Sequence, residues 1–173
     1  QYAQRTVQAW RASGEMGALR YVRCVMPAGN WEANGFGDYI EDDARVATLQ
    51  YDPAPGDMSA ETAKEYRAFV NYYIHQVNLL RHFLGEPYQV THADPSGVVL
   101  LGRSRGGVAC AIEMSPYRTT VDWQESVLVA FEKGYVRLEL PAPMAINRAG
   151  RVKILRDPGN GATPEVTAPH LPW

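Results

Sequence analysis

Cysteine is scarce in this sequence, and its scarcity excludes two architectures. The 173 residues include two cysteines, Cys24 and Cys110. Two are too few for the disulfide framework of a small secreted domain, and they lack the paired spacing of a zinc site. Both lie in apolar, strand-like segments, so we expect buried thiols and a reducing, cytoplasmic location.

A large net charge and long apolar runs are also lacking. Lysine and arginine total 17 against 19 acidic residues, without the clustered positive charge of a nucleic-acid-binding protein. No apolar run approaches the roughly 20 residues that cross a bilayer. We therefore expect neither nucleic acid nor a membrane as a partner. A composition of 46 % apolar and 21 % charged residues indicates one folded domain over residues 1–173.

Several short motifs are missing as well. No Gly-x-Gly-x-x-Gly follows a predicted strand and no P-loop is present, so no segment is expected to hold a nucleotide phosphate. The absence of a Gly-x-Ser-x-Gly elbow argues against a serine hydrolase. His75 and His82 lie two helical turns apart, about 10 Å, which is too far to share an ion. We predict no metal site and no cofactor-binding residue in this chain.

The apolar periodicity changes near the middle of the chain. Residues 3–13 and 61–84 have helical spacing, and glycine follows each segment. Alternating or β-branched runs predict strands at 19–26, 88–93, 98–103, 107–114, 121–132, 135–140 and 151–156. Tight turns at 105–107 and at Lys133-Gly134, where glycine is expected to supply a positive φ, join some of them as hairpins. We predict an α+β fold with a large, mainly antiparallel sheet and helices packed on one face.

Some boundaries carry specific expectations. Pro27 is expected to end the first strand, and residues 156–173 to form an extended tail. Asp57 or Ser59 is expected to cap the long helix, and Thr62 with Glu65 matches the spacing of a capping box.

The long helix has two distinct faces. Its predicted core stripe consists of Val70, Tyr73, Ile74, Val77, Leu80 and Leu84. On another face, Asn71, His75, Asn78 and His82 fall within about 60° of one another. Histidine suits proton transfer near neutral pH, and Asn71, one turn from His75, can orient a hydroxyl group but cannot act as a base. An ordinary solvated histidine remains the alternative on spacing alone.

Residues 71–87 read Asn-Tyr-Tyr-Ile-His-Gln-Val-Asn-Leu-Leu-Arg-His-Phe-Leu-Gly-Glu-Pro. This segment resembles the signature helix of the Gfo/Idh/MocA oxidoreductases, the glucose–fructose oxidoreductase and inositol dehydrogenase family, which reads Asp-x-x-x-His-x-x-Asp-Leu-x-Arg-x-x-Leu-Gly-Glu-Pro. Residues 10–22 resemble the same family's Ser-Gly-x-x-Gly-x-x-x-x-Val passage into the first strand of its C-terminal domain. With the hairpin at Lys133-Gly134, these matches cover most of residues 1–156.

The resemblance implies that the chain is the C-terminal domain, similar to that of dihydrodipicolinate reductase, of a longer enzyme. A Rossmann domain, absent here, would bind NAD or NADP. This domain would contact a sugar, cyclitol or related substrate and assemble as a homodimer or tetramer through its sheet. Hydride would pass between the nicotinamide and a hydroxyl-bearing carbon. We expect the present chain alone to be inactive.

The resemblance also implies roles for individual residues. His75 matches the family's catalytic histidine, while Asn71 stands where the family has aspartate and Asn78 replaces a second one. We expect His75 and Asn71 to be catalytic. The predicted substrate contacts are Asn78, Tyr72, Trp31 and Asn34. Trp31 and Asn34 lie in a long loop, where they either line the site or anchor the loop. Because Asn71 replaces an acid, a non-catalytic homologue serving as an assembly or ligand-binding module is the alternative.

Overall fold

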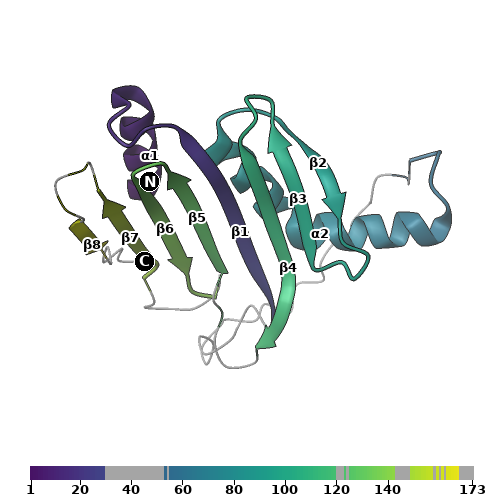
Figure 1. Cartoon of the computed structure of the whole chain (residues 1–173). Helices are drawn as coiled ribbons and strands as arrows, with labels where there is room; N and C mark the ends of the chain where they lie inside the picture. Colours follow the sequence, from purple (N-terminus) through teal and green to yellow (C-terminus); the bar gives the residue numbers. More distant parts are fainter. Residues whose placement is uncertain are drawn as a thin grey trace.

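The computed structural model describes residues 1–29, 53, 55–119, 123, 125–142, 149–157, 159, 161 and 163–167. This part of the chain forms two helices, α1 (Tyr2–Ser13) and α2 (Ala60–Leu84), and eight strands. The strands are β1 (Leu19–Gly29), β2 (Tyr88–Ala93), β3 (Val99–Ser104), β4 (Ala109–Thr119), β5 (Glu125–Phe131), β6 (Gly134–Leu140), β7 (Arg151–Arg156) and β8 (Thr163–Thr167). They form one sheet in the order β2-β3-β4-β1-β5-β6-β7-β8 (Figure 1).

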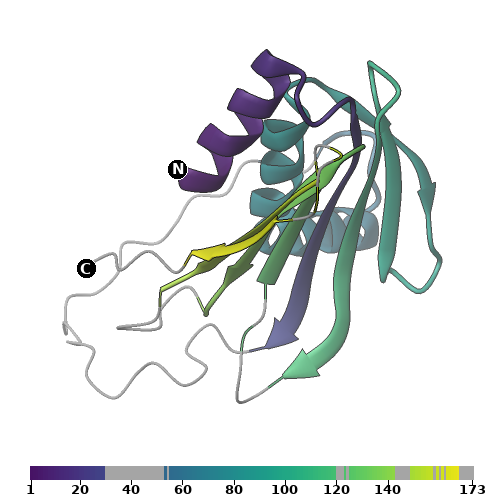
Figure 2. The same cartoon turned by 60° about the vertical axis from the view of Figure 1, so that its left-hand side comes forward.

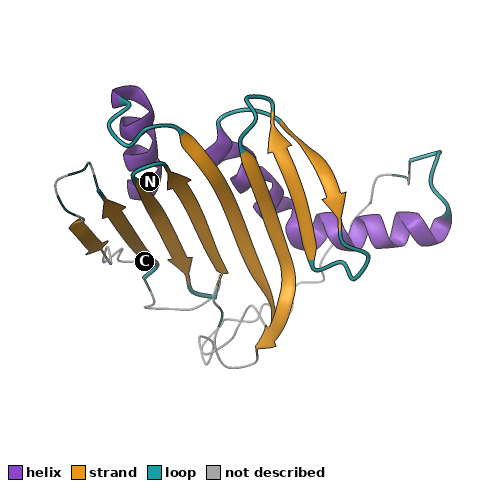
Figure 3. Cartoon of the chain, in the orientation of Figure 1, coloured by secondary structure: helices purple, strands orange, loops and turns teal. Residues whose placement is uncertain are grey.

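Both helices pack on the same face of the sheet (Figure 2), which confirms the α+β prediction. We call the other face the open face. Neighbouring strands are antiparallel except at the centre, where β1 and β4 run parallel with Val22 opposite Cys110 (Figure 3). Parallel pairing is possible there because α2, β2 and β3 intervene between the two strands in the chain.

The main core lies between the helices and the sheet. Val7 and Trp10 of α1 and Leu80 and Phe83 of α2 pack against alternate residues of the strands. Cys24 and Cys110 are both buried and unpaired, as predicted. Among the helices of the described residues, none combines the length and apolarity that a membrane span requires.

The first turn of α2 confirms Ser59, one of the two predicted caps, but not the predicted capping box. Ser59 is the N-cap, and its hydroxyl oxygen accepts the N–H of Thr62 at 3.1 Å. Thr62 therefore lies inside the helix, and the expected Thr62–Glu65 capping box is wrong. The Ser59 hydroxyl thereby satisfies one of the free N–H groups of the first turn.

The buried face of α2 also differs from the predicted stripe. Leu80 and Leu84 are buried, but Ile74 is 36 % exposed, whereas Gln76 is only 2 % exposed. The Gln76 amide Nε2 donates to Glu125 Oε1 on β5 at 2.6 Å. The amide Nε2 is thus paired, whereas Gln76 Oε1 is buried without a partner among the described residues. An apolar pattern does not detect a polar contact of this kind in the core.

Pro27 does not end β1, which continues to Gly29. The register with β4 shifts between Met26 and Ala28. Proline has no N–H to contribute to a ladder, so it is tolerated at this irregularity.

The glycine of the β5–β6 hairpin has a different role from the predicted one. Phe131 and Gly134 are paired as a hairpin requires, but Gly134 is not among the residues with positive φ. A Cβ at Gly134 would instead clash with the carbonyl oxygen of Leu155 on the neighbouring strand. Gly107, in the β3–β4 turn, does have a positive φ, of 89°.

The expected tail contains a strand. β8 pairs antiparallel with β7, with Val152 opposite Thr167. β5 is described from Glu125, and the predicted strand start at Val121 lies outside the described residues.

Candidate functional site

One exposed face of α2 carries the polar row. Asn71, His75, Asn78 and His82 are all exposed to solvent, on a helix whose other side packs against the core. The row therefore has free access to a ligand or to another part of the protein.

The C-terminal end of this row opens into a shallow hollow of about 710 Å³. It is lined by Asn78, Arg81, His82, Gly85, Glu86 and Pro87. The Arg81 guanidinium donates to Asn78 Oδ1 at 3.0 Å, so this amide oxygen is already oriented. His75 and Asn71 lie further toward the helix N-terminus and do not line the hollow.

The end of α2 is held in place by its own cap and by contacts from α1. Gly85 ends the helix at φ 70°, and its N–H donates to the carbonyl oxygen of Arg81. Arg11 of α1 donates to the carbonyl oxygens of Phe83 and Leu84, two of the groups that a helix C-terminus leaves unpaired. The position of the hollow is therefore fixed relative to α1.

Glu86 joins the hollow to the β3–β4 turn. Its Oε1 accepts the Ser104 hydroxyl at 2.6 Å and the Gly106 N–H at 2.9 Å. The Ser104 hydrogen bond, followed by the Gly106 amide, lowers the pKa of the Glu86 carboxyl below its ordinary value. Arg81 and Glu86 were not singled out as site residues from the sequence, although both belong to the segment that carries the family resemblance.

Tyr72 has a structural contact. Its ring is half-buried, and its hydroxyl donates to the carbonyl oxygen of Pro27 at 3.1 Å. Burial raises the pKa of this hydroxyl, so it stays protonated. Tyr72 thus links α2 to β1. Because its hydroxyl hydrogen is already donated, its oxygen can only accept a hydrogen bond from a ligand. Trp31 and Asn34 lie outside the described residues.

The N-terminus of α2 does not fit a nicotinamide dinucleotide. Its pyrophosphate is usually held by free N–H groups at a helix N-terminus after a glycine-rich turn. At the N-terminus of α2, Ser59 takes the Thr62 N–H, and Glu61 adds negative charge. Over the part of the chain that the structure covers, no group of three or more His, Cys, Asp or Glu side chains is placed to hold a metal ion.

No protein-family profile matches the chain, and no curated protein matches its sequence. Its fold is similar to that of solved oxidoreductases. KijD10, a 3-ketoreductase from Actinomadura kijaniata solved with NADP, superposes with a TM-score of 0.53 and 13 % identity, covering 96 % of this chain and 44 % of that one. Its open conformation with TDP-benzene and NADP gives a TM-score of 0.52 at 13 % identity, with the same coverage of 96 % and 44 %.

An oxidoreductase from Agrobacterium radiobacter, solved with NAD+, L-tartaric acid and magnesium, has a TM-score of 0.50 and 14 % identity, covering 100 % of this chain and 45 % of that one. At such low identity the similarity establishes the fold alone. The chain has the α+β fold of part of these oxidoreductases and spans less than half of their length.

Proposed function

We propose that this chain is the substrate-binding and oligomerisation part of an NAD(P)-dependent oxidoreductase acting on a hydroxyl-bearing carbon of a sugar, cyclitol or related compound. The observation that carries the proposal is the exposed row on α2, which leads into a hollow at the helix end. The fold similarity to oxidoreductases solved with NADP and NAD+ supports it. The cofactor itself is held mainly by a part of the protein outside this chain.

Within the row, His75 is the residue that exchanges a proton with the substrate oxygen. Asn71, one helical turn away, donates or accepts a hydrogen bond and keeps a hydroxyl group oriented. Asn78 and Arg81 at the rim of the hollow contact the more distant hydroxyl groups of the substrate. Their mutual hydrogen bond already orders both side chains, so less side-chain entropy is lost when the substrate binds.

The open face of the sheet is the surface through which we propose that copies of the protein assemble into a dimer or tetramer. Its outward residues include Leu128, Ala130 and Tyr135, which line an apolar depression of about 620 Å³. The helices leave this face uncovered. An obligate interface there would bury about 2,000 Å² or more.

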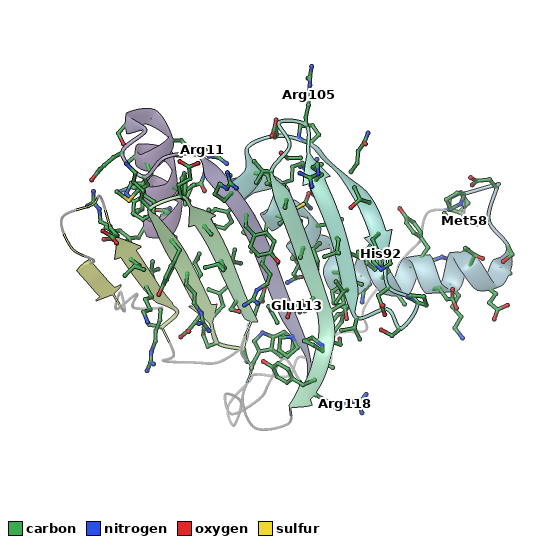
Figure 4. The ribbon with its side chains drawn as sticks, in the orientation of Figure 1. Arg11, Met58, His92, Arg105, Glu113 and Arg118 are labelled. Atoms are coloured by element: carbon green, nitrogen blue, oxygen red, sulfur yellow. The ribbon has the colours of Figure 1, made fainter. Side chains whose placement is uncertain are left out.

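The test of His75 is a kinetic one on the full-length protein. We expect His75→Ala to lower kcat/KM by about a hundredfold or more, the usual contribution of general acid–base catalysis. Turnover is measured as NAD(P)H absorbance across a panel of sugars and cyclitols. The matched control is His92→Ala, an exposed histidine on β2 (Figure 4), which should leave kcat/KM unchanged. Equal kcat/KM in His75→Ala and wild type would refute the assignment.

The second candidate is a non-catalytic homologue that binds a ligand or assembles with other subunits. Asparagine at position 71, which cannot act as a base, favours it. In that case the full-length protein binds a polyol at the α2 row but neither binds nicotinamide cofactor nor turns over. Cofactor titration by fluorescence therefore separates the two functions.

A further inference from the structure

The hollow at the C-terminal end of α2 has more positive than negative charge around it. Arg81 and Glu86 line it, and Arg11 and Arg105, both labelled in Figure 4, lie close enough to Glu86 to stabilise its charge. Three guanidinium groups thus lie in or beside the hollow, together with one carboxylate. The surplus of positive charge attracts an anion from solution.

Glu86 does not use up this positive charge. Its Oε1 already accepts the Ser104 hydroxyl and the Gly106 N–H, and both bonds hold the carboxylate at the β3–β4 turn. The ion pairs of the described residues are formed by other arginines, namely Arg20, Arg23, Arg137 and Arg156. Among the described residues, Arg81 therefore has no carboxylate partner.

The guanidinium of Arg81 has free donors. It is exposed, and it donates to Asn78 Oδ1 at 3.0 Å, an amide oxygen without net charge. A guanidinium carries five N–H groups in a planar fork, which matches two oxygens of a carboxylate or phosphate. Most of this fork remains accessible to a ligand in the hollow.

The end of α2 would by itself disfavour an anion, because a helix C-terminus has a partial negative charge. Here its last carbonyl groups are occupied. Arg11 donates to the carbonyl oxygens of Phe83 and Leu84, and the Gly85 N–H donates to that of Arg81. The charge at the hollow is therefore determined mainly by its arginines.

The spacing along α2 relates Arg81 to the proposed catalytic residue. Arg81 follows His75 by six residues, a rise of about 9 Å along the helix axis. Asn78 lies midway between them, both along the helix and around it. Because Arg81 donates to Asn78, its side chain is turned toward the exposed row. A sugar that lies over Asn78 can therefore approach His75 at one end and Arg81 at the other.

We propose, as an extension that rests on the proposed function, that the substrate carries an anionic group, a phosphate or a carboxylate, which Arg81 binds with its two-pronged fork. The polyol part of the substrate lies over Asn78, and its reacting carbon lies near His75. Arg81 is then a specificity-determining residue that selects acidic sugars over neutral ones. It takes no part in the transfer of the proton or the hydride.

The test is isothermal titration calorimetry of the full-length protein with D-glucose 6-phosphate, D-glucuronate and D-glucose. We expect at least one of the two anionic sugars to bind about tenfold more tightly than D-glucose. The tighter of the two identifies the anionic group. Arg81→Met should remove the preference, and Arg81→Lys, which keeps the charge but not the fork, should retain part of it. The matched control is Arg67→Met, an exposed arginine of α2 outside the hollow, which should keep the preference.

Two results would overturn the proposal. The first is that neither anionic sugar binds, or that neither binds more tightly than D-glucose. The second is that Arg81→Met keeps the wild-type preference. His75→Ala should lose turnover but keep the preference for the anionic sugar. Normal turnover in His75→Ala would refute the catalytic role of this histidine and would leave the binding test of Arg81 intact.

Discussion

Glu86 connects three separate segments through one carboxylate. It follows the C-cap of α2, accepts hydrogen bonds from Ser104 and Gly106 of the β3–β4 turn, and lies near Arg11 of α1. These bonds favour the charged form, which is why the pKa of Glu86 is lowered. A single side chain thereby sets the position of one wall of the α2 hollow.

The lowered pKa of Glu86 predicts a pH dependence of stability. The carboxylate stabilises the folded state fully at pH values above its unfolded pKa, near 4.5. This stabilisation is lost as the pH falls through the lower, folded pKa. We expect Glu86→Gln to lower Tm at pH 7 and to show a shallower fall in Tm between pH 5 and pH 3 than wild type.

The control for this prediction is Glu65→Gln, an exposed acid on α2. Its Tm should follow the wild-type pH profile. Identical profiles for Glu86→Gln and wild type would mean that the hydrogen bonds of Glu86 do not stabilise the folded state.

At the scale of elements, α1 and α2 are joined through Arg11. The helical pattern places Arg11 beside the apolar residues Val7 and Trp10, and its guanidinium caps the last carbonyl groups of α2. A cation at a helix C-terminus is also favoured by the helix dipole. The two helices therefore stabilise each other although 46 residues, 14–59, separate them in the chain.

We expect Arg11→Met to destabilise the protein by about 2 kcal/mol, the usual value of charged hydrogen bonds at a partly buried site. Urea denaturation measures the change in the free energy of unfolding. Arg5→Met, on an exposed position of the same helix, should change it by less than about 0.5 kcal/mol. Equal values for the two variants would contradict the capping role.

The hairpin between β5 and β6 depends on a close approach. No Cβ fits at Gly134 without displacing the Leu155 carbonyl, which belongs to the backbone of β7. Gly134→Ala should therefore destabilise the protein by about 2 kcal/mol. Gly56→Ala, where nothing lies within 4 Å of the added carbon and φ is not positive, should have little effect on Tm. If Gly134→Ala left the free energy of unfolding unchanged, β6 and β7 would be able to move apart at little cost.

At the scale of the whole molecule, the two cysteines report on the integrity of the core. Cys24 is 1 % exposed and Cys110 is 2 % exposed. In the parallel pair β1–β4, Cys24 lies opposite Ile112 and Cys110 lies opposite Val22. Burial is the main reason why the pKa of both thiols is raised. Burial and the raised pKa both protect the two thiols from reaction with thiol reagents.

We expect both thiols of the native protein to react with DTNB at pH 8 only at the rate of unfolding. In guanidinium chloride they should react at once, which controls for chemical competence. Fast modification of either thiol in the native protein would show that the centre of the sheet opens locally.

Local pattern was sufficient for much of the fold. The apolar periods of α1, α2 and most strands, and the glycines that end both helices, are properties of short segments. The exposed row Asn71–His75–Asn78–His82 also follows from helical spacing. Each of these features depends only on residues that are close together in the chain, so the local sequence determines it.

Tertiary structure alone decided the remaining features. The parallel β1–β4 pair, the burial of Gln76 against Glu125, and Arg11 at the end of α2 each join residues far apart in the chain. The same holds for Glu86, which reaches a turn 20 residues away. Whether a polar side chain faces water or a distant partner depends on which segments meet, and a local pattern contains no information about that.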